Sequence, residues 1–416
     1  MTSALLNLSQ RRTTLTDNNT KKSDGKPPIG SLSREYNNVL TKHTLSFAAL
    51  LSVATLAGTP TSSRATDFGK PGGPVNLVVG YQPYYTEAWS GVVVNGKQLW
   101  KKYLPAGSTV EFQVGLQGAN IVNAMTGEKQ HIGYVGDMPG IAATFRNLPD
   151  RGATDIRIVA ALGTSKQQCN IFLVRNDAPE FKSGADAVKW MDGKLTSSPH
   201  GSCTDRFARA AFKKAGITPS SYLNQNIEVI TTNFRAGKLD AAVLWEPTAT
   251  KIAQAGLARR VASGEDFDAT DGGLLIMLAD LIKQRPDVQR AWLEAELDAQ
   301  LFLSDPKNAE EMSKLAESQT EQIDRKVLWA ALYGENPASA GGGKVKIQFD
   351  YILNDRVQAL LTDATAFLNS LPNKPAAEPK IRAEAVDDKV AREVLEARKL
   401  KSPVGVVEAR PLTEFK

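Results

Sequence analysis

"VEFQVGLQGANIVNAMTGEKQHIGYVG", residues 110–136, is the stretch that decides the fold class of this chain. It begins with an alternation of Val110, Phe112 and Val114, which is typical of a strand with one buried face. A short helix is expected at residues 118–128, and the run "HIGYVG" predicts a second strand. Strand, helix and strand in this order indicate parallel strands, because parallel neighbours need a crossover connection.

The same alternation of apolar runs and amphipathic segments continues along the chain. Further strands are expected at residues 75–80, 155–162, 169–175, 194–199, 227–232, 240–245, 258–263 and 272–278. Further helices are expected at residues 89–104, 139–147, 183–193, 202–216, 248–256, 286–303, 324–334 and 387–400, the first with an interruption near residues 95–96. After residue 278 the pattern is mainly helical, with a Pro- and Ala-rich linker at residues 372–385. The sequence therefore predicts two α/β units followed by a helical C-terminal portion.

The clearest of these helices is the one at residues 202–216. Ser202 and Asp205 form a capping box at its start, and Gly216 ends it. Ser183 is expected to cap the preceding helix in the same way.

The positive charge of the chain is concentrated at its N-terminus. The 416 residues carry a formal net charge of +5, and residues 1–65 hold eight Lys or Arg against three Asp or Glu. The remainder is neutral overall, so the basic balance does not indicate a nucleic-acid-binding surface, and no nucleic-acid partner is expected.

The N-terminal 65 residues have the pattern of an export signal. Lys42 and His43 precede about fifteen mostly apolar residues, which are too short to span a bilayer comfortably. Ser63 and Ala65 then have the small-residue spacing of a cleavage site. We therefore expect residues 1–65 to be a signal peptide and leader that are removed near Ala65, and the mature chain to be exported.

Catalytic motifs are scarce in this sequence. It contains no GxSxG, no GxxxxGK[ST], no HExxH and no GxGxxG after a strand, and it has three histidines. This scarcity favours binding over catalysis, so we expect no enzyme activity, no cofactor and no metal.

Polar, small and aromatic residues follow the predicted strands instead. In open α/β sheets, ligands bind outside the carboxyl ends of the strands. Glycines there let backbone N–H groups approach a ligand, and the helix beginning at Ser202 offers an anion seat. Gln117 and Asn120 can donate hydrogen bonds without adding charge. The expected ligand-binding residues are Tyr84, Tyr85, Glu87, Gln117, Asn120, Asp137, Thr164, Ser202, Cys203, Thr204 and Glu246.

Each of these residues also has a structural interpretation. The ring-rich loop after the first strand can be core, with Tyr81 and Trp89 the strongest candidates for packing. Asp205 is a better candidate for a helix cap than for a ligand contact, and His131 opens a strand and is expected to be structural.

The chain has two cysteines, Cys169 and Cys203, and both lie in the exported part. A single disulfide is expected in an oxidising compartment, and its loop of about 35 residues would contribute roughly 3–4 kcal/mol. The alternative is two buried free thiols. A zinc site is not expected, because the spacing is not CxxC and His200 is the one imidazole close to them in sequence.

Together, several motifs resemble the periplasmic solute-binding proteins of nitrate/sulfonate/bicarbonate-type ABC importers. They are "VNLVVGYQP", "VEFQVGLQGANIVNAMTGE", "HIGYVGDMPG", "IRIVAAL", "SPHGSCTDRFARAAFKKAGI" and "GKLDAAVLWEP". The resemblance covers roughly residues 75–300, and the last motif is its most specific part.

The resemblance implies a two-lobe type II periplasmic-binding fold, with each lobe a mainly parallel sheet flanked by helices. Lobe 1 would comprise residues 66–168 and 264–371, lobe 2 residues 169–263, and a linker and helix residues 372–416. The ligand would sit between the lobes of a monomer, and a membrane permease with its ATPase subunit would receive it.

The first loop departs from sulfonate- and nitrate-binding members, because Tyr84, Tyr85 and Glu87 stand where such members commonly keep small or polar contacts. The cleft would also have four acidic residues near it, which would repel a simple inorganic anion. They are Glu87, Asp137, Asp205 and Glu246. A small organic anion or zwitterion of the sulfonate, nitrate or taurine kind is therefore expected. The alternative is a binder of a thiamine pyrimidine precursor, or a precursor-synthase-like enzyme on the same fold.

Overall fold

The computed structural model describes residues 66–146, 154–371 and 381–416. All of them fall within one structural unit, residues 63–416. The expected signal peptide and its cleavage position lie outside the described residues, as does most of the Pro- and Ala-rich linker. Within the described residues, none of the helices combines the length and the apolar character that crossing a membrane requires.

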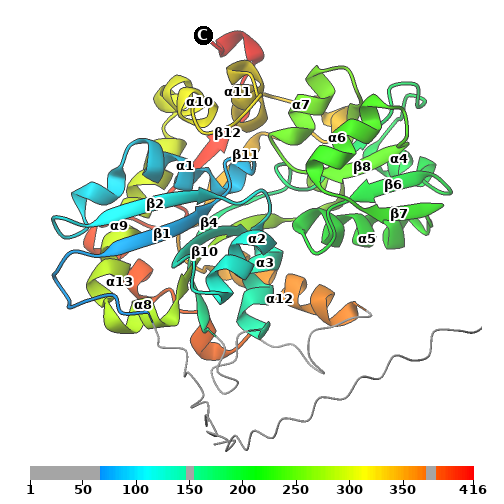
Figure 1. The fold of residues 1–416 in the computed structure, drawn as a ribbon. Coiled ribbons are helices and arrows are strands. Elements are labelled where there is room, and N and C mark those ends of the chain that lie inside the picture. The colour runs from blue at the N-terminus through cyan, green and yellow to red at the C-terminus, as the bar shows by residue number, and fades with distance from the viewer. Residues whose placement is uncertain (1–65, 147–153, 372–380) are drawn as a thin grey trace, which may run out of the picture. The chain divides into compact units, whose positions relative to one another are not determined.

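The described strands form two mixed sheets (Figure 1). The first has seven strands in the order β12-β11-β4-β10-β3-β1-β2. Their bounds are β1 Asn76–Tyr81, β2 Thr109–Val114, β3 Ile132–Gly136, β4 Ile156–Ser165, β10 Asp271–Leu278, β11 Val345–Phe349 and β12 Gly405–Glu408. The second has five strands in the order β7-β6-β8-β5-β9. Their bounds are β5 Ile171–Val174, β6 Leu195–Ser198, β7 Ser221–Asn224, β8 Ala241–Leu244 and β9 Arg259–Ser263.

Helices pack on both sheets (Figure 1). Around the seven-stranded sheet, α1 packs on α9 and α3 packs on α12, while in the five-stranded part α4 packs on α5. The helices are α1 Trp89–Gly96, α2 Gly118–Thr126, α3 Asp137–Arg146, α4 Gly184–Trp190, α5 Cys203–Ala215, α6 Ile227–Arg235, α7 Thr248–Gln254, α8 Ala279–Gln284, α9 Pro286–Ser304, α10 Ala309–Glu317, α11 Arg325–Tyr333, α12 Asp355–Ser370 and α13 Lys389–Ala397.

The strand directions correct one expectation from the sequence. In the first sheet β1 pairs in parallel with β2 and β3, but β10 is antiparallel to both β3 and β4. In the second sheet β6 is parallel to β7 and β8, whereas β5 is antiparallel to β8 and β9. The sheets are therefore mixed rather than mainly parallel. The chain leaves the first sheet after β4 and returns to it at β10, and antiparallel pairs occur where it makes these two passages.

Three local expectations were wrong. Residues 227–232 belong to helix α6, not to a strand: Asn226 caps it by accepting a hydrogen bond from the Val229 N–H, and Ile227, Ile230 and Phe234 form its buried face at helical spacing. Strand β7 was missed because its residues are half-buried or exposed and carry no apolar run. The C-terminal portion is not only helical, since β11 and β12 extend the first sheet there.

The helix caps were predicted correctly. The Ser183 and Ser202 side chains accept hydrogen bonds from the backbone N–H groups of Asp186 and Asp205. Gly216 ends α5 in the left-handed conformation at φ 68°. The Asp205 carboxylate, however, accepts from the Gly201 N–H rather than from Ser202. Helix α1 stops at Gly96, as the interruption predicted.

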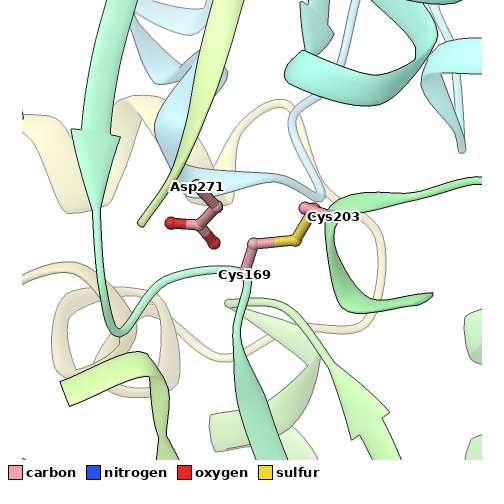
Figure 2. Close-up of side chains that lie close together, drawn as sticks. All are labelled: Cys169, Cys203 and Asp271. Carbon is pink, nitrogen blue, oxygen red and sulfur yellow. A yellow bond between two sulfur atoms is a disulfide. The ribbon is translucent and has the colours of Figure 1, made fainter. Parts of the chain in front are cut away.

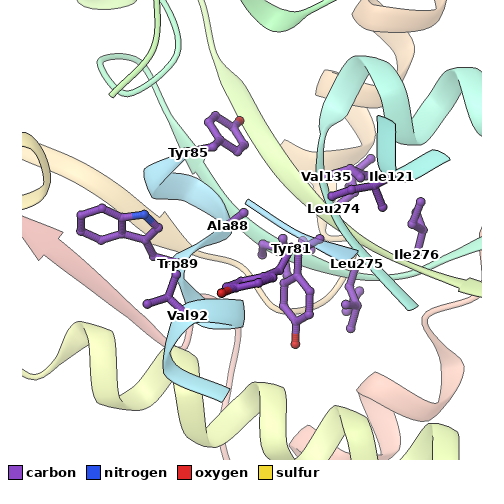
Figure 3. Close-up of a cluster of buried hydrophobic side chains, with 14 of the residues drawn as sticks. Tyr81, Tyr85, Ala88, Trp89, Val92, Ile121, Val135, Leu274, Leu275 and Ile276 are labelled. Carbon is purple, nitrogen blue, oxygen red and sulfur yellow. The ribbon is translucent and has the colours of Figure 1, made fainter. Parts of the chain in front are cut away.

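Part of the ring-rich loop is core. Tyr81 and Trp89 are buried among apolar side chains of α1 and the first sheet (Figure 3). The Trp89 indole N–H donates to the Pro83 carbonyl at 2.8 Å, which satisfies its polar atom. His131 is also structural, because its Nδ1 accepts from the Val78 N–H at 3.1 Å. The packing interpretation of these three residues is confirmed.

Candidate functional site

A recess lies where strand ends of the two sheets meet. It has an empty volume of about 440 Å³, counted to its open mouth. The first sheet contributes residues that follow β1, β2 and β3, and the second sheet contributes residues that follow β6 and β8. The lining residues are Gln82, Tyr85, Gln117, Gly118, Ala119, Gly136, Pro139, Pro199, His200, Gly201, Ser202, Cys203 and Trp245.

Two helices begin at the wall of this recess. Gly118 is the first residue of α2, and Cys203 is the first residue of α5. Within the described residues, the backbone N–H groups of Gly118, Ala119 and Cys203 make no hydrogen bond. Free N–H groups and the positive end of the helix dipole favour negative charge at such a position. The recess therefore has an electropositive backbone although no Lys or Arg lines it.

Neutral side chains add donors to these backbone groups. Gln117 is half-buried, and its amide makes no hydrogen bond to another described residue. The His200 Nε2 is buried and has no partner among the described residues, and burial lowers the pKa of this imidazole. Both side chains can therefore donate to a bound oxygen at neutral charge.

Two aromatic rings give the recess an apolar wall. Tyr85 and Trp245 are both buried and meet edge to face, with ring centroids 6.4 Å apart. The Trp245 indole N–H donates to the Tyr84 carbonyl at 2.9 Å, so a residue of the second sheet is tied to the loop after β1. An organic portion of a ligand would be accommodated against these rings.

A group of buried carboxyls lies behind Tyr85. The Tyr85 hydroxyl donates to Glu87, and burial, with the nearby Asp271 second, raises the pKa of Glu87 well above its usual range. Burial, with Asp137 second, raises the pKa of Asp271 to about 8. Asp137 accepts from Arg206 Nη2 at 2.7 Å, although burial still raises its pKa. Burial therefore favours the protonated form of Glu87 and of Asp271, which reduces the negative charge that they place near the recess.

The other two acids, Glu246 and Asp205, have ion-pair partners and do not line the recess. Glu246 accepts from Arg260 Nη1 at 3.1 Å and from the Thr250 N–H at 2.9 Å. Asp205 accepts from Arg209 Nε at 2.8 Å and from the Gly201 N–H at 3.0 Å. Asp205 therefore has a structural role, but its carboxylate does not complete the predicted capping box with Ser202.

The structure brings together four of the eleven expected ligand residues. Tyr85, Gln117, Ser202 and Cys203 line the recess. Three more lie beside one of these four residues but do not line the recess, and they are Glu87, Asp137 and Thr204. The Thr204 hydroxyl lies 2.7 Å from the hydroxyls of both Ser198 and Ser202, where it supports the start of α5.

The other four lie elsewhere. Tyr84 lines a separate groove, and its hydroxyl accepts from the Glu321 N–H at 2.8 Å. Asn120 is exposed on α2. Thr164 is buried and donates to Asp350 at 2.7 Å, because its strand β4 pairs with β11 there. Glu246 is occupied by Arg260, so the structure does not place these four at the recess.

Several important residues were missed from the sequence. Neither Trp245, which lines the recess, nor Asp271 is among the expected ligand-binding residues. Asp271 begins β10, and strand-end reasoning examined residues that follow strands. Because β10 runs antiparallel to β3, its first residues lie at the edge where β3 ends, as the pairing of Gly273 with Gly136 shows. An Asp immediately before a buried apolar run was the available signal.

Cys169 and Cys203 form a disulfide, with their Cα atoms 6.2 Å apart. The bond joins the segment between β4 and β5 to the first turn of α5. The expected pairing is therefore present in the structure.

Comparison with known proteins gives one family match. Residues 70–317, more than half of the chain, match the model of the NMT1-like family. A curated relative, the taurine-binding periplasmic protein of Escherichia coli (strain K12), is 26% identical over 251 residues, which cover 58% of this chain and 72% of the relative.

Two solved structures share the fold. The alkanesulfonate-binding protein SsuA from Xanthomonas axonopodis pv. citri, bound to MOPS, has a TM-score of 0.58 at 19% identity and covers 76% of this chain and 99% of its own. The nitrate-binding protein NrtA from Synechocystis PCC 6803 has a TM-score of 0.61 at 17% identity and covers 79% of this chain and 90% of its own. The expected type II periplasmic-binding fold and the resemblance stated from the sequence are both confirmed.

Proposed function

Because the chain belongs to the NMT1-like family, we propose that it is the substrate-binding component of an ABC importer. It captures a small organic anion or zwitterion of the sulfonate, taurine or nitrate kind. The observation that carries this proposal is the recess, where the ends of strands from both sheets and the first turns of α2 and α5 surround one space.

The chemistry of the recess supports an anionic group on the ligand. Backbone N–H groups at Gly118 and Cys203 and the Gln117 amide would donate hydrogen bonds to its oxygens, and Tyr85 and Trp245 would cover its organic part. The objection that acids would repel a simple anion is weakened, because Glu246 and Asp205 are partnered and Asp271 has a pKa near 8. We propose Tyr85, Gln117, Ser202 and Cys203 as the ligand contacts that the sequence identified.

We propose that residues 66–168 and 264–371 form one lobe and residues 169–263 the other, and that ligand shifts them toward a closed form. Contacts between the two sides support this. Arg206 of α5 bonds to Asp137 of α3 at 2.7 Å, and Trp245 bonds to the loop after β1. A ligand drives closure only by the difference in its affinity for the two forms.

The surroundings of the protein follow from the same proposal. Residues 1–65 act as a signal peptide and leader with cleavage near Ala65, and the mature chain is a periplasmic monomer. It delivers its ligand to a membrane permease and an ATPase subunit. It has no enzyme activity, and the binder of a thiamine pyrimidine precursor, or a precursor-synthase-like enzyme, remains the competing function.

Thermal unfolding with candidate ligands tests the proposal. Purified mature chain would be titrated with taurine, ethanesulfonate, nitrate, bicarbonate with calcium, and an aminopyrimidine. A true ligand at 100 times its Kd stabilises the folded state by about 2.7 kcal/mol. We expect a sulfonate to do so without being consumed. Stabilisation by the aminopyrimidine alone, or chemical turnover, would transfer the assignment to the competing function.

Two neighbouring amides provide a matched pair of variants. Gln117→Ala removes a donor at the recess and is expected to weaken binding about tenfold, the size of one hydrogen bond. Asn120→Ala changes an exposed amide in the first turn of α2, three residues after Gln117, and is expected to change the Kd less than about twofold. Calorimetric titration measures both. Equal Kd values for the two variants would remove the recess from the proposal.

A further inference from the structure

The disulfide is accompanied by a buried carboxyl group, that of Asp271, which forms no ion pair with a described residue. Among the described residues, Cys169, Cys203 and Asp271 form one group of potential metal ligands, with their ligand atoms within 4.8 Å of one another. Figure 2 shows the Asp271 carboxyl beside the sulfur–sulfur bond. All three residues are buried, and neither oxygen of Asp271 accepts a hydrogen bond of good geometry from a described residue.

A buried carboxyl that forms no ion pair is costly and calls for an explanation. The sulfur atoms of a disulfide carry no proton, so they cannot donate to Asp271. Arg206 is a cation whose charge acts on Asp271. Its Nη2, however, already donates to the Asp137 carboxylate and to the Thr270 carbonyl. In the oxidised form Asp271 therefore has no cation bound to it, and its hydrogen-bonding neighbours are the Glu87 carboxyl and the Cys169 backbone N–H.

We propose that reduction of the Cys169–Cys203 bond converts this group into a zinc site with two thiolates and the Asp271 carboxylate as ligands. Zinc binds four ligands at tetrahedral positions, and a Zn–S distance of about 2.3 Å places two sulfur ligands roughly 3.8 Å apart. Such a separation is smaller than the 4.8 Å within which the three ligand atoms already lie.

The chemistry balances with a dithiol as the reductant. One thiolate of the dithiol attacks Cys203 Sγ, the sulfur–sulfur bond breaks, and the second thiol of the reductant closes its own disulfide. Cys169 and Cys203 together gain two electrons and two protons. Zn²⁺ then displaces the two thiol protons, and any proton on the carboxyl, into solvent.

The position of Cys203 makes both steps accessible. It lines the recess, which is the side from which a small reductant would approach, whereas Cys169 is fully buried and does not line it. It is also the first residue of α5, and a helix N-terminus favours the thiolate form. With three protein ligands, the fourth position of the metal remains for water or for a ligand on the side of the recess.

Metal uptake by the purified chain tests this inference without any organic ligand, so its failure would leave the proposed function intact. The protein is reduced with a phosphine under anaerobic conditions, mixed with zinc, freed of excess metal by gel filtration and assayed for zinc content. We expect one zinc per reduced chain and none in the oxidised chain. Co²⁺ is expected to give a thiolate-to-cobalt charge-transfer band in the reduced chain.

Variants locate the site. Asp271→Asn is expected to weaken zinc binding about 100-fold, since losing even an outer-shell partner costs roughly 10–100-fold. Cys169→Ser should abolish the cobalt band. Glu296→Gln, which alters another buried carboxyl, is the control and should bind zinc like the wild type. Absence of zinc or of the cobalt band in reduced wild type, equal uptake by the oxidised form, or unchanged affinity in Asp271→Asn would each overturn the inference.

Discussion

The acidic side chains on the two sides of the recess differ in what compensates their charge. On the side of the five-stranded sheet, Glu246 is paired with Arg260, and Asp205 with Arg209. On the side of the seven-stranded sheet, Glu87 and Asp271 are buried without an ion-pair partner among the described residues. Asp137 is intermediate, because its partner Arg206 comes from the opposite side.

The paired acids stabilise the fold, whereas the unpaired acids remain available to bind a ligand or a metal. A paired carboxylate already has its hydrogen bonds, so a ligand or a metal would have to displace an arginine. An unpaired buried carboxyl avoids the cost of ionisation by keeping its proton until something supplies a positive charge. Acidic side chains thus lie on both sides of the recess, but Glu87 and Asp271 are the ones among them that remain available to a ligand or a metal.

The largest expected effect comes from breaking the partnered side. Arg260→Met leaves the buried Glu246 carboxylate without its cation, and Arg260 also donates to the Ala340 carbonyl at 2.9 Å. We expect the free energy of unfolding in urea to fall by about 3–5 kcal/mol. Adding Glu246→Gln to this variant removes the stranded charge, so the double variant should be less destabilised than the sum of the singles. Strict additivity would show that the ion pair is not coupled.

A buried acid without a cation beside it should make the stability of the folded chain depend on pH. Glu296 of α9 accepts from Gln300 Nε2 at 2.8 Å, and burial raises its pKa from 4.5 to about 7. Between these two values the folded chain retains a proton that the unfolded chain has lost, so this residue's contribution to stability falls as pH rises through that window.

The variant Glu296→Gln lacks this titration. Its stability relative to wild type is expected to rise by about 2–3 kcal/mol between pH 5 and pH 8, since each pKa unit corresponds to about 1.4 kcal/mol. Urea unfolding at both values measures the change. A pH-independent difference would mean that Glu296 is already ionised in the folded chain.

The smallest effect is expected on the unpartnered side itself. In Glu87→Gln the amide oxygen can still accept from the Tyr85 hydroxyl, and no ion pair is lost. We expect the free energy of unfolding at neutral pH to stay within about 1 kcal/mol of the wild-type value. A loss as large as that of Arg260→Met would contradict the difference between the two sides.

Residues near one another in the sequence determined the local structure well. The βαβ stretch at residues 110–136, the Ser183 and Ser202 caps and the Gly216 helix end follow from periodicity and from backbone preferences, which act over a few residues. The helix at residues 227–235 was misjudged because a β-branched run resembles a strand until the spacing of its buried residues is known.

The order and direction of the strands, and with them the site, depended on the tertiary structure. The sequence by itself determined that strand ends would carry glycines, amides and rings. Four of the residues that it predicted as ligand contacts, Tyr85, Gln117, Ser202 and Cys203, line the recess. Only the antiparallel course of β10 brings Asp271 to the disulfide, and only the pairing of β4 with β11 takes Thr164 away from the recess. Strand direction is fixed by contacts between residues far apart in the chain, and a local pattern carries no record of them.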